Sequence, residues 1–583
     1  MTKRWRIHSH AADQVASLGR AAGVSSILAQ LFLCRGISDP DAVRRFLALK
    51  LSDLRSPEEL PGCAAAAERI WEAIGAGRRI VVYGDYDVDG ISGTALLWRC
   101  LKLLGANVGY YLPHRIDEGY GLHSDALRRL AAEKASLVVT VDCGISAVDE
   151  AQTARQCGLE LIITDHHTPG DPLPDAAAIV HPRLPGTAYP FGGLSGSGVA
   201  LKLAWAICQV SAGAKRVSPV MRDYLLGAVG LAALGTVADV VPLVDENRVL
   251  VHHGLESLKR SPSIGVAALM KIAKLDDKPA LDAEDIGFML APRLNAAGRL
   301  GQGALAAELL MTDRPDRATE LAAYIDGLNA SRQTLERSIY LAANKQLKER
   351  FDPEGDAAFV LADRGWHPGV LGIVAGRLAE KYHRPVVLVA LDQLGTRPPT
   401  GSARSVPGLD LHAALAACGE HLLGHGGHAA AAGLSVEERK IDLFRECFVD
   451  HVAGLTCEEH RTAELLIDAE SPLSAFTPKT VQDIERMAPF GHGNSRPLVC
   501  ASGVELADSP KMLGKSGRHM SMKLRQHNIA FRAVAFGVSD RAEELLGVDG
   551  PLDVAFHPVI NTFRGNRSVE LRLVDWRTSR VGG

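Results

Sequence analysis

Short apolar runs alternate with longer helical stretches from about residue 80 to residue 235, and this alternation restricts the fold more than any other feature. Four of the runs are each followed at once by ionisable side chains; they are residues 79–83, 137–141, 159–163 and 177–180. The pattern predicts a parallel sheet covered by helices on both faces. Open α/β sheets bind ligands at the carboxyl ends of their strands, so the ionisable clusters fall where a site is expected.

The first cluster is acidic. Asp85, Asp87 and Asp89 stand at positions i, i+2 and i+4, and an extended backbone would put their carboxylates on one face. Three anions so close together repel one another unless cations or protons intervene, and oxygen ligands suit magnesium, manganese or calcium. A calcium loop of the EF-hand type begins in the same way but needs Glu at its twelfth position, which is Leu96 here. A solvated acidic turn is the simpler alternative.

The second cluster contains two adjacent histidines, His166 and His167. Imidazole nitrogen can ligate a transition metal, which favours manganese, although a structural histidine pair is an equal alternative. Asp142 follows the second run, and Asp239 follows the apolar stretch 231–238. Several desolvated carboxylates would be costly, whereas two divalent ions would neutralise them. The predicted cofactors are therefore two divalent cations, Mn²⁺ or Mg²⁺.

Length and composition exclude several classes of protein. A chain of 583 residues is too long for one core, so three or four domains are expected. The longest apolar run, 225–238, is shorter than the roughly 20 residues that cross a bilayer, and no membrane span is predicted. The ten cysteines include no C-x-x-C pair, which fits a reduced cytoplasm. Because the net charge is -4, the chain as a whole does not attract nucleic acid, and any nucleic-acid contact is expected to come from a local group of basic residues.

The rest of the chain predicts further domains. One long charged helix, spanning roughly 50 Å at 1.5 Å per residue, is expected as a spacer between domains. A second α/β unit follows, with strands near 358–361 and 385–390, and short strands from about 464 to 577 suggest a small β-barrel. The predicted domains are a helical segment (1–50), a catalytic α/β domain (51–312), the long helix (313–350), the second α/β domain (351–460) and the barrel (461–578).

Four motifs resemble those of the RecJ exonucleases in the DHH phosphoesterase superfamily. They are Y-G-D-Y-D-x-D-G at 83–90, T-V-D-C-G at 140–144, T-D-H-H at 164–167 and A-L-G-T-V-A-D-V-V-P-L at 233–243. The resemblance extends from about residue 50 to 577. It implies a parallel-sheet DHH domain, a long connecting helix, a second α/β domain of the DHH-associated type and a C-terminal OB-fold β-barrel. The metal ligands that it implies are Asp87, Asp89, Asp142, His166 and Asp239, with Asp142 as a bridge.

The resemblance also implies other site residues. Asp85 and His167 would have catalytic roles beside the metals, orienting ligands or the scissile phosphate. Substrate-binding residues in the first domain would be Arg115, Tyr120, Arg293, Asn295 and Arg299. Those in the second domain would be Ser402, Arg404, Ser405, Gly426, Gly427 and His428.

The predicted barrel carries a local excess of positive charge. Between Ser509 and Arg532 six lysines and arginines occur without one Asp or Glu, and Phe531 and Phe536 are nearby for stacking. Such a strip resembles an OB-fold surface for single strands, with Lys511, Lys515 and Arg518 as substrate-binding residues. Structural alternatives remain for these residues. Each arginine could form a salt bridge, the glycines could form a packing turn, and the basic strip of the barrel could be a solvated surface.

The function that the resemblance implies is metal-dependent hydrolysis of single-stranded DNA from the 5′ end, in recombinational and mismatch repair. The protein is expected to be a cytoplasmic monomer that works with a single-strand DNA-binding protein and a RecQ-type helicase. One alternative is a phosphodiesterase for oligonucleotides or cyclic dinucleotides, and another is a catalytically inactive DHH scaffold. The long helix and basic barrel argue against the first because a dinucleotide needs no extended track. The complete set of ligand types argues against the second.

Overall fold

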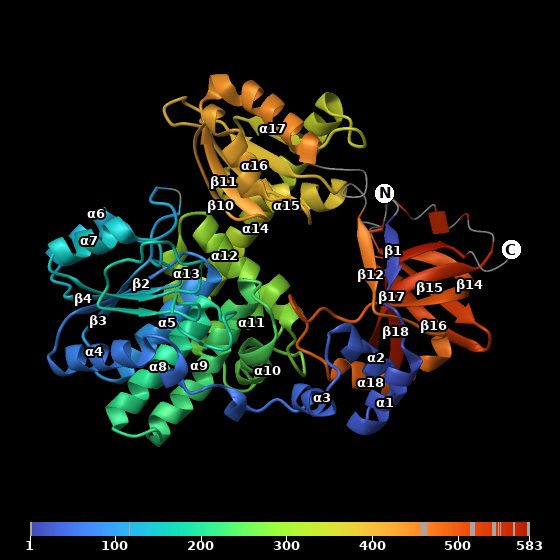
Figure 1. Ribbon diagram of the computed structural model, residues 1–583, viewed down its shortest axis with the longest axis horizontal. Helices are drawn as coiled ribbons and strands as arrows, with labels where there is room; N and C mark the ends of the chain where they lie inside the picture. The colour runs from blue at the N-terminus through green and yellow to red at the C-terminus, as the bar shows by residue number, and fades with distance from the viewer. Residues whose placement is uncertain are drawn as a thin grey trace. The chain divides into compact units, whose positions relative to one another are not determined.

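The computed structural model describes residues 3–579, apart from 116, 456–462, 514–518, 539–540, 542–543, 546, 548–549 and 564–565. The chain forms two compact units (Figure 1). One comprises Leu51–Thr462, and the other comprises Thr2–Lys50 together with Ala463–Gly583. The first unit contains the predicted catalytic domain, the long helix and the second α/β domain.

A five-stranded parallel sheet lies at the centre of the catalytic domain, as predicted. The observed strands begin and end within one residue of the four predicted runs, and β3 is an additional edge strand that was not predicted. In spatial order the strands are β3 (Val108–Tyr111), β2 (Ile80–Gly84), β4 (Leu137–Val141), β5 (Glu160–Thr164) and β6 (Ala178–Val180).

Helices cover both faces of this sheet because alternate residues of each strand point to opposite sides (Figure 1). Ile80 and Val82 share one core with one set of helices, whereas Val81 and Tyr83 share another core with the opposite set. The helices of the first set are α4 (Cys63–Gly75), α5 (Val88–Leu103) and α8 (Gly196–Ala212), and those of the second are α6 (Ser124–Ala132) and α7 (Val148–Gln156).

The domain is completed by a group of helices that follow α8. They are α9 (Pro219–Ala238), α10 (Asp245–Arg260), α11 (Ile264–Ile272), the π-helix η3 (Asp285–Leu290), α12 (Ala291–Arg299) and α13 (Gly303–Met311). In the described part of the chain, α9 is the one unbroken helix long and apolar enough to cross a membrane, and α1 and α2 would qualify only as a sharply bent pair. Half of the apolar stretch of α9 is buried, and the helix packs against α5, α8 and α10. Helix α9 is therefore a core helix of this domain.

The long helix α14 (Pro315–Arg350) joins two cores, as expected of a connecting element. Leu321 and Ile325 in its first half belong to the core of the catalytic domain. Ile339 and Leu347 in its second half belong to a core of the second α/β domain.

The second α/β domain has a mixed five-stranded sheet in the order β10-β11-β9-β8-β7. The strands are β7 (Phe359–Asp363), β8 (Val386–Ala390), β9 (Thr400–Arg404), β10 (Leu422–Gly427) and β11 (Ala431–Val436). The glycine-rich segment forms the β10–β11 hairpin, and β11 pairs with β9. The helices are α15 (Leu371–Tyr382), α16 (Leu411–Ala417) and α17 (Ile441–Leu455).

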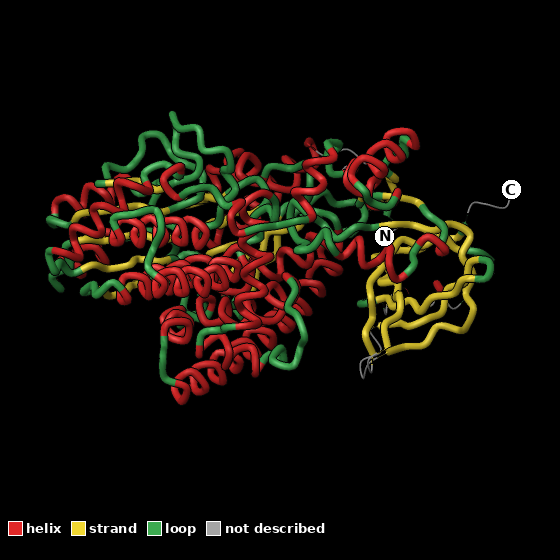
Figure 2. Tube along the Cα trace, turned by 90° about the horizontal axis from the view of Figure 1, so that it is seen from below, coloured by secondary structure: helices red, strands yellow, loops and turns green. Residues whose placement is uncertain are grey.

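The second unit is built around a closed five-stranded barrel, visible as the group of long strands at one end of Figure 2. Its strands are β14 (Val499–Leu513), β15 (His519–Gln526), β16 (Ile529–Ala535), β18 (Asn566–Thr578) and β17 (Leu552–Phe563), and pairing of β14 with β17 closes it. The predicted barrel is confirmed. Because the sheet is closed, each of the five strands pairs with a neighbour on both sides over at least part of its length.

The first 50 residues belong to this barrel unit, which their sequence did not indicate. Strand β1 (Arg4–Ile7) pairs in parallel with β12 (Glu464–Ile467). Residues of α2 pack with Ile484, Met487 and Phe490 in one core. The remaining elements of the unit are α1 (Ala12–Ala22), α2 (Ser26–Cys34), α3 (Pro40–Leu47), β13 (Ala469–Glu470) and α18 (Pro478–Glu485).

Candidate metal centre and nucleic-acid interface

Acidic side chains gather at the carboxyl edge of the parallel sheet. Asp85, Asp142 and Asp165 directly follow β2, β4 and β5, and all three are buried. Asp142 has a φ of 66°, a left-handed conformation that Asp and Asn adopt more readily than most residues. The parallel topology therefore brings together carboxylates that lie up to 80 residues apart in the chain.

The acidic turn after β2 does not stay extended, so the expectation that Asp85, Asp87 and Asp89 share one face of a strand is wrong. Helix α5 begins at Val88, and Asp87 is its N-cap: its Oδ1 accepts from the backbone N–H groups of Asp89 and Gly90, at 2.9 and 3.1 Å. Capping the free N–H groups of a first helical turn favours this local fold. The three carboxylates still reach one site, from a strand end, a cap and a first helical turn.

Two other helices shape the site around Asp89. The backbone N–H groups of Gly196 and Ser197, at the start of α8, donate to its carboxylate at 2.6 and 2.9 Å. Asp239 is the C-cap of α9. This helix can lie close to Asp89 because Gly235 has no side chain; a Cβ there would lie only 2.3 Å from Asp89 Oδ1. The sequence did not predict these contacts: Gly196 and Ser197 carry no charge or motif that marks them, and the motif that contains Gly235 does not show what the glycine approaches.

His166 lies at the centre of the acidic cluster. Its Nε2 is 3.0 Å from Asp142 Oδ1, 3.5 Å from Asp239 Oδ2 and 3.9 Å from Asp89 Oδ2. Three groups of side chains place possible ligand atoms within 4.8 Å of one another: Asp89, His166 and Asp239; Asp142, His166 and His167; and Asp85, Asp87 and Asp142. Asp142 and His166 each occur in two of these groups, and Asp85 stands among the possible ligands.

The residues fit a pair of divalent cations. Within the described residues, Asp85 Oδ1, Asp142 Oδ1, His166 Nε2 and Asp239 Oδ2 are buried and make no hydrogen bond. The 3.0 Å approach of His166 to Asp142 thus lacks hydrogen-bond geometry. Burial and neighbouring carboxylates raise the pKa of Asp142 well above its ordinary value and that of Asp239 to about 9, because negative charge accumulates here without compensation. Burial also lowers the pKa of His166 to about 4, which keeps its imidazole neutral, as metal ligation requires.

A second layer of polar groups orients the two histidines. Asp165 Oδ1 lies 2.7 Å from His167 Nδ1 and accepts from the backbone N–H of His166 at 2.7 Å. Burial alone would raise the pKa of Asp165, but hydrogen bonding, chiefly from His167, lowers it to about 2. Arg183 donates to the carbonyl of His166 at 2.5 Å, and Tyr120 Oη lies 3.1 Å from His167 Nδ1. Arg183 was not predicted, because its role depends on a backbone contact.

Four guanidinium groups converge beside the acidic cluster. Arg115 lies 4.8 Å above the ring of Tyr86, and Arg404 donates to Ser402 Oγ at 3.2 Å. Burial, together with the charges of Arg115, Arg332 and Arg404, lowers the pKa of Arg299 to about 10. Arg332 pairs with Glu336 at 3.0 Å, but the excess of positive charge among the four groups favours an anion, and a phosphate suits guanidinium geometry. Arg332, on α14, was missed because nothing distinguishes it from the helix's other charges.

Three of the predicted substrate-binding residues make contacts within the fold. Arg293 donates to Asp326 at 2.8 Å and to the Met289 carbonyl at 2.6 Å. Asn295 Oδ1 accepts from the Val88 N–H at 3.2 Å, at the start of α5. Ser405 Oγ donates to the Leu409 carbonyl at 2.9 Å.

The glycine-rich hairpin of the second α/β domain contributes to a cavity beside the histidines. The cavity has a volume of about 530 Å³ and is lined by Tyr120, His167, Gly427 and His428, among others. Its volume is in the range of small-molecule sites and suits a nucleotide. Gly426 lies on β10, one residue before this lining.

The barrel surface is less basic than its sequence suggested. Arg525 pairs with Glu505 at 2.8 Å, and Arg532 pairs with Glu570 at 2.7 Å. Lys511 is exposed on β14, whereas Lys515 and Arg518 lie outside the described residues. The Phe536 side chain is 57% exposed, and its ring centroid lies 5.3 Å from that of His519, an arrangement available for base stacking.

Comparisons with known proteins agree along the chain. Residues 79–232 match the DHH family N-terminal domain, 355–453 the DHHA1 domain and 467–575 the RecJ OB domain. The chain is 36% identical over 572 residues to the single-stranded-DNA-specific exonuclease RecJ of Bacillus subtilis, covering 98% of this chain and 70% of that protein. It is 33% identical over 585 residues to the Escherichia coli exonuclease of the same name, covering 98% and 99%.

Solved structures give the same result for the whole fold. The structure of RecJ in complex with Mn²⁺ from Thermus thermophilus superposes with a TM-score of 0.82 and 32% sequence identity, covering 99% of this chain and 80% of that one. A second structure from the same organism contains Mg²⁺ and gives a TM-score of 0.77.

Proposed function

Because the chain belongs to the RecJ family of DHH phosphoesterases, we propose that it is a metal-dependent exonuclease that degrades single-stranded DNA from the 5′ end. The observation that carries the proposal is the set of buried, unpartnered ligand atoms around Asp142 within the described residues. The exonucleases named among its relatives, and the Mn²⁺ and Mg²⁺ of the related structures, support it.

Asp87, Asp89, Asp142, His166 and Asp239 would hold two divalent cations, with Asp142 shared between them and Asp85 adjacent. Such a pair, when bound, supplies a water of lowered pKa and stabilises charge on the attacking and leaving oxygens.

His167 would act on the phosphate itself. Its Nδ1 is paired with Asp165, so when the ring is protonated the second proton, on Nε2, is available to a non-bridging phosphate oxygen. Burial would lower the pKa of His167, but the hydrogen bond to Asp165 and nearby carboxylates raise it, which favours the protonated donor. Tyr120 and Asp165 would hold the ring in this orientation.

The assay that tests the proposal uses oligonucleotides labelled at either end, single-stranded or duplex, with Mn²⁺, Mg²⁺ or chelator. We expect mononucleotides to be released from the 5′ end of single strands only, and only with metal. Cleavage restricted to dinucleotides would favour the small-nucleotide phosphodiesterase, and no cleavage would favour an inactive scaffold. A role in recombinational and mismatch repair, with a single-strand DNA-binding protein and a RecQ-type helicase, follows from family membership and is part of the proposal.

Recognition of a 5′ phosphate is predicted to depend on Arg404. We expect Arg404→Ala to lower kcat/KM for 5′-phosphorylated DNA roughly ten- to a hundredfold, since a charged hydrogen bond contributes about 1.5–3 kcal/mol, and to change the value for 5′-hydroxyl DNA much less. Steady-state rates on the two substrates measure this ratio.

Arg293→Ala is the matched control, because its guanidinium already pairs with Asp326. The Arg293→Ala variant should be less stable than the unmodified protein but should have the same ratio of kcat/KM values for the 5′-phosphorylated and 5′-hydroxyl substrates. Equal ratios in the Arg404 and Arg293 variants would contradict phosphate recognition by Arg404.

DNA binding by the barrel is predicted to depend on Lys511 and its basic neighbours in the sequence. Replacing Lys511, Lys515 and Arg518 together with alanine should weaken binding of single-stranded DNA. It should also reduce the slope of log K against log salt by about 0.7 for each phosphate that the variant no longer neutralises. Fluorescence anisotropy over a range of salt concentrations measures both effects. Arg525→Ala, at a side chain paired with Glu505, should have a smaller effect, and an unchanged slope in the triple variant would rule out this surface.

A further inference from the structure

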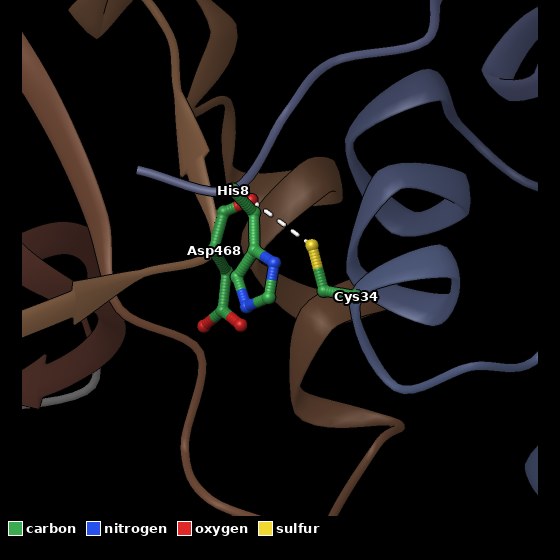
Figure 3. Close-up of side chains that lie close together, drawn as sticks. All are labelled: His8, Cys34 and Asp468. Carbon is green, nitrogen blue, oxygen red and sulfur yellow. Dashed lines mark hydrogen bonds between the residues drawn. The ribbon is translucent and has the colours of Figure 1, made fainter. Parts of the chain in front are cut away.

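A second cluster of metal-ligating side chains lies in the barrel unit. His8 follows β1, Cys34 is the last residue of α2, and Asp468 stands between β12 and β13. One donor atom of each lies within 4.8 Å of the other two, and Figure 3 shows the three side chains close together. We propose that His8, Cys34 and Asp468 bind a divalent transition metal ion of the zinc type.

The donor set selects the class of ion. Cysteine sulfur, histidine nitrogen and a carboxylate oxygen are the zinc ligands of proteins, whereas magnesium and calcium prefer oxygen alone. A thiolate and a carboxylate together neutralise the two charges of the ion. Three protein ligands leave a fourth tetrahedral position for water.

Neighbouring groups are arranged to support these ligands. Gln30 is buried, and its Nε2 donates to Cys34 Sγ at 3.4 Å and to the Asp468 carbonyl at 3.3 Å. An amide donor directed at the sulfur stabilises a thiolate. Asp468 Oδ2 accepts from the Leu498 N–H at 2.8 Å, which orients the carboxylate and leaves its other oxygen for the ion.

Binding requires one proton to leave. The Cys34 thiol donates to the Asp468 carbonyl at 3.2 Å, shown as the dashed line in Figure 3. Formation of the sulfur–metal bond would transfer that proton to solvent, with no change of oxidation state.

The consequence of binding is structural. Cys34 and Asp468 are 434 positions apart in the chain, and His8 directly extends the strand that pairs with β12. An ion held by all three would fasten the N-terminal segment to the barrel segment beside the β1–β12 pairing. Its role thus differs from that of the acidic centre in the first unit.

Cobalt titration of the metal-stripped full-length protein tests the proposal. Co²⁺ bound to a thiolate gives a near-ultraviolet charge-transfer band, which the carboxylate and imidazole ligands of the acidic centre cannot produce. We expect the band to saturate at one sulfur-bound ion per chain and to disappear when Zn²⁺ is added.

Variants locate the sulfur and its companions. Cys34→Ser should lose the band, and Cys157→Ser, the same change at a partly buried cysteine of the first unit, should keep it. His8→Ala and Asp468→Asn should weaken cobalt binding at least about tenfold. The second of these keeps an oxygen that can accept from Leu498. No sulfur band in the unmodified protein, or the same band in a folded Cys34→Ser variant, would overturn the proposal.

A measurement without substitutions gives an independent answer. Zn²⁺ should slow alkylation of Cys34 by iodoacetamide, followed by mass spectrometry of the peptides, while the rate at Cys157 stays constant. Equal rates at Cys34 with and without Zn²⁺ would count against the site even if a variant failed to fold.

Discussion

Asp142→Asn is expected to reduce hydrolysis of single-stranded DNA by about a thousandfold or more, because it removes the carboxylate shared by two groups of proposed metal ligands. Asparagine is the suitable replacement, since it keeps the side-chain shape and tolerates the left-handed backbone at this position. The fold should survive. Removing one negative charge from a crowded cluster relieves repulsion, so the metal-free variant should unfold at the same temperature as the unmodified protein or a higher one.

Single-turnover rates with excess enzyme and thermal unfolding in chelator measure these two effects. Asp245→Asn provides the control, because Asp245 also has a positive φ but pairs with Arg55 at the surface. It should retain activity and cost about 1 kcal/mol of stability or less. Near-normal turnover by folded Asp142→Asn protein would refute the assigned metal centre.

Metal binding is expected to remove an unusual pH dependence of stability. Burial and nearby carboxylates raise the pKa of Asp239 from its ordinary 3.8 to about 9 in the folded protein. A carboxyl with a raised pKa binds its proton more tightly in the folded state, so the stability that it contributes is present below pH 3.8 and is lost as pH rises through about 9. In chelator, the free energy of unfolding should therefore fall across this window, by at least about 1.4 kcal/mol, the equivalent of one pKa unit.

Divalent cations should remove this loss because they replace the protons. At a hundredfold excess over its Kd, each bound ion adds about 2.7 kcal/mol. Denaturant unfolding from pH 5 to 9, with Mn²⁺ or with chelator, compares the two conditions. Asp239→Asn should flatten the profile in chelator. Stability that rises with pH in chelator, or that does not respond to Mn²⁺, would contradict the electrostatic account of the site.

Several side chains of the acidic centre could be predicted because their positions depend on local chain order. Asp142 and His166 follow apolar runs that can only be buried strands, and parallel strands must present their carboxyl ends at one edge. The turn after β2 shows the limit of this reasoning. The alternation of Asp85, Asp87 and Asp89 suggested an extended segment. Asp87 instead caps a helix that begins at Val88, and a helical backbone places the Asp89 side chain differently from an extended one.

The basic residues show a second limit. Arg293 and Arg332 look alike in the sequence, and each pairs with an acid, Asp326 and Glu336 respectively, yet Arg332 also stands beside Arg299. On the barrel, acids distant in sequence pair with Arg525 and Arg532. Whether a cation is free for phosphate depends on neighbours that only packing supplies.

The sequence by itself determined the order of strands and helices in the catalytic domain, the acidic and histidine side chains at the strand ends and the existence of a barrel. Tertiary structure alone decided that Gly196 and Ser197 hold Asp89, that four arginines converge and that the first 50 residues join the barrel, placing His8 and Cys34 beside Asp468. The physical reason is the range of the interactions. Strand and cap formation depend on neighbouring residues, whereas these contacts join segments that meet only when separate cores have packed.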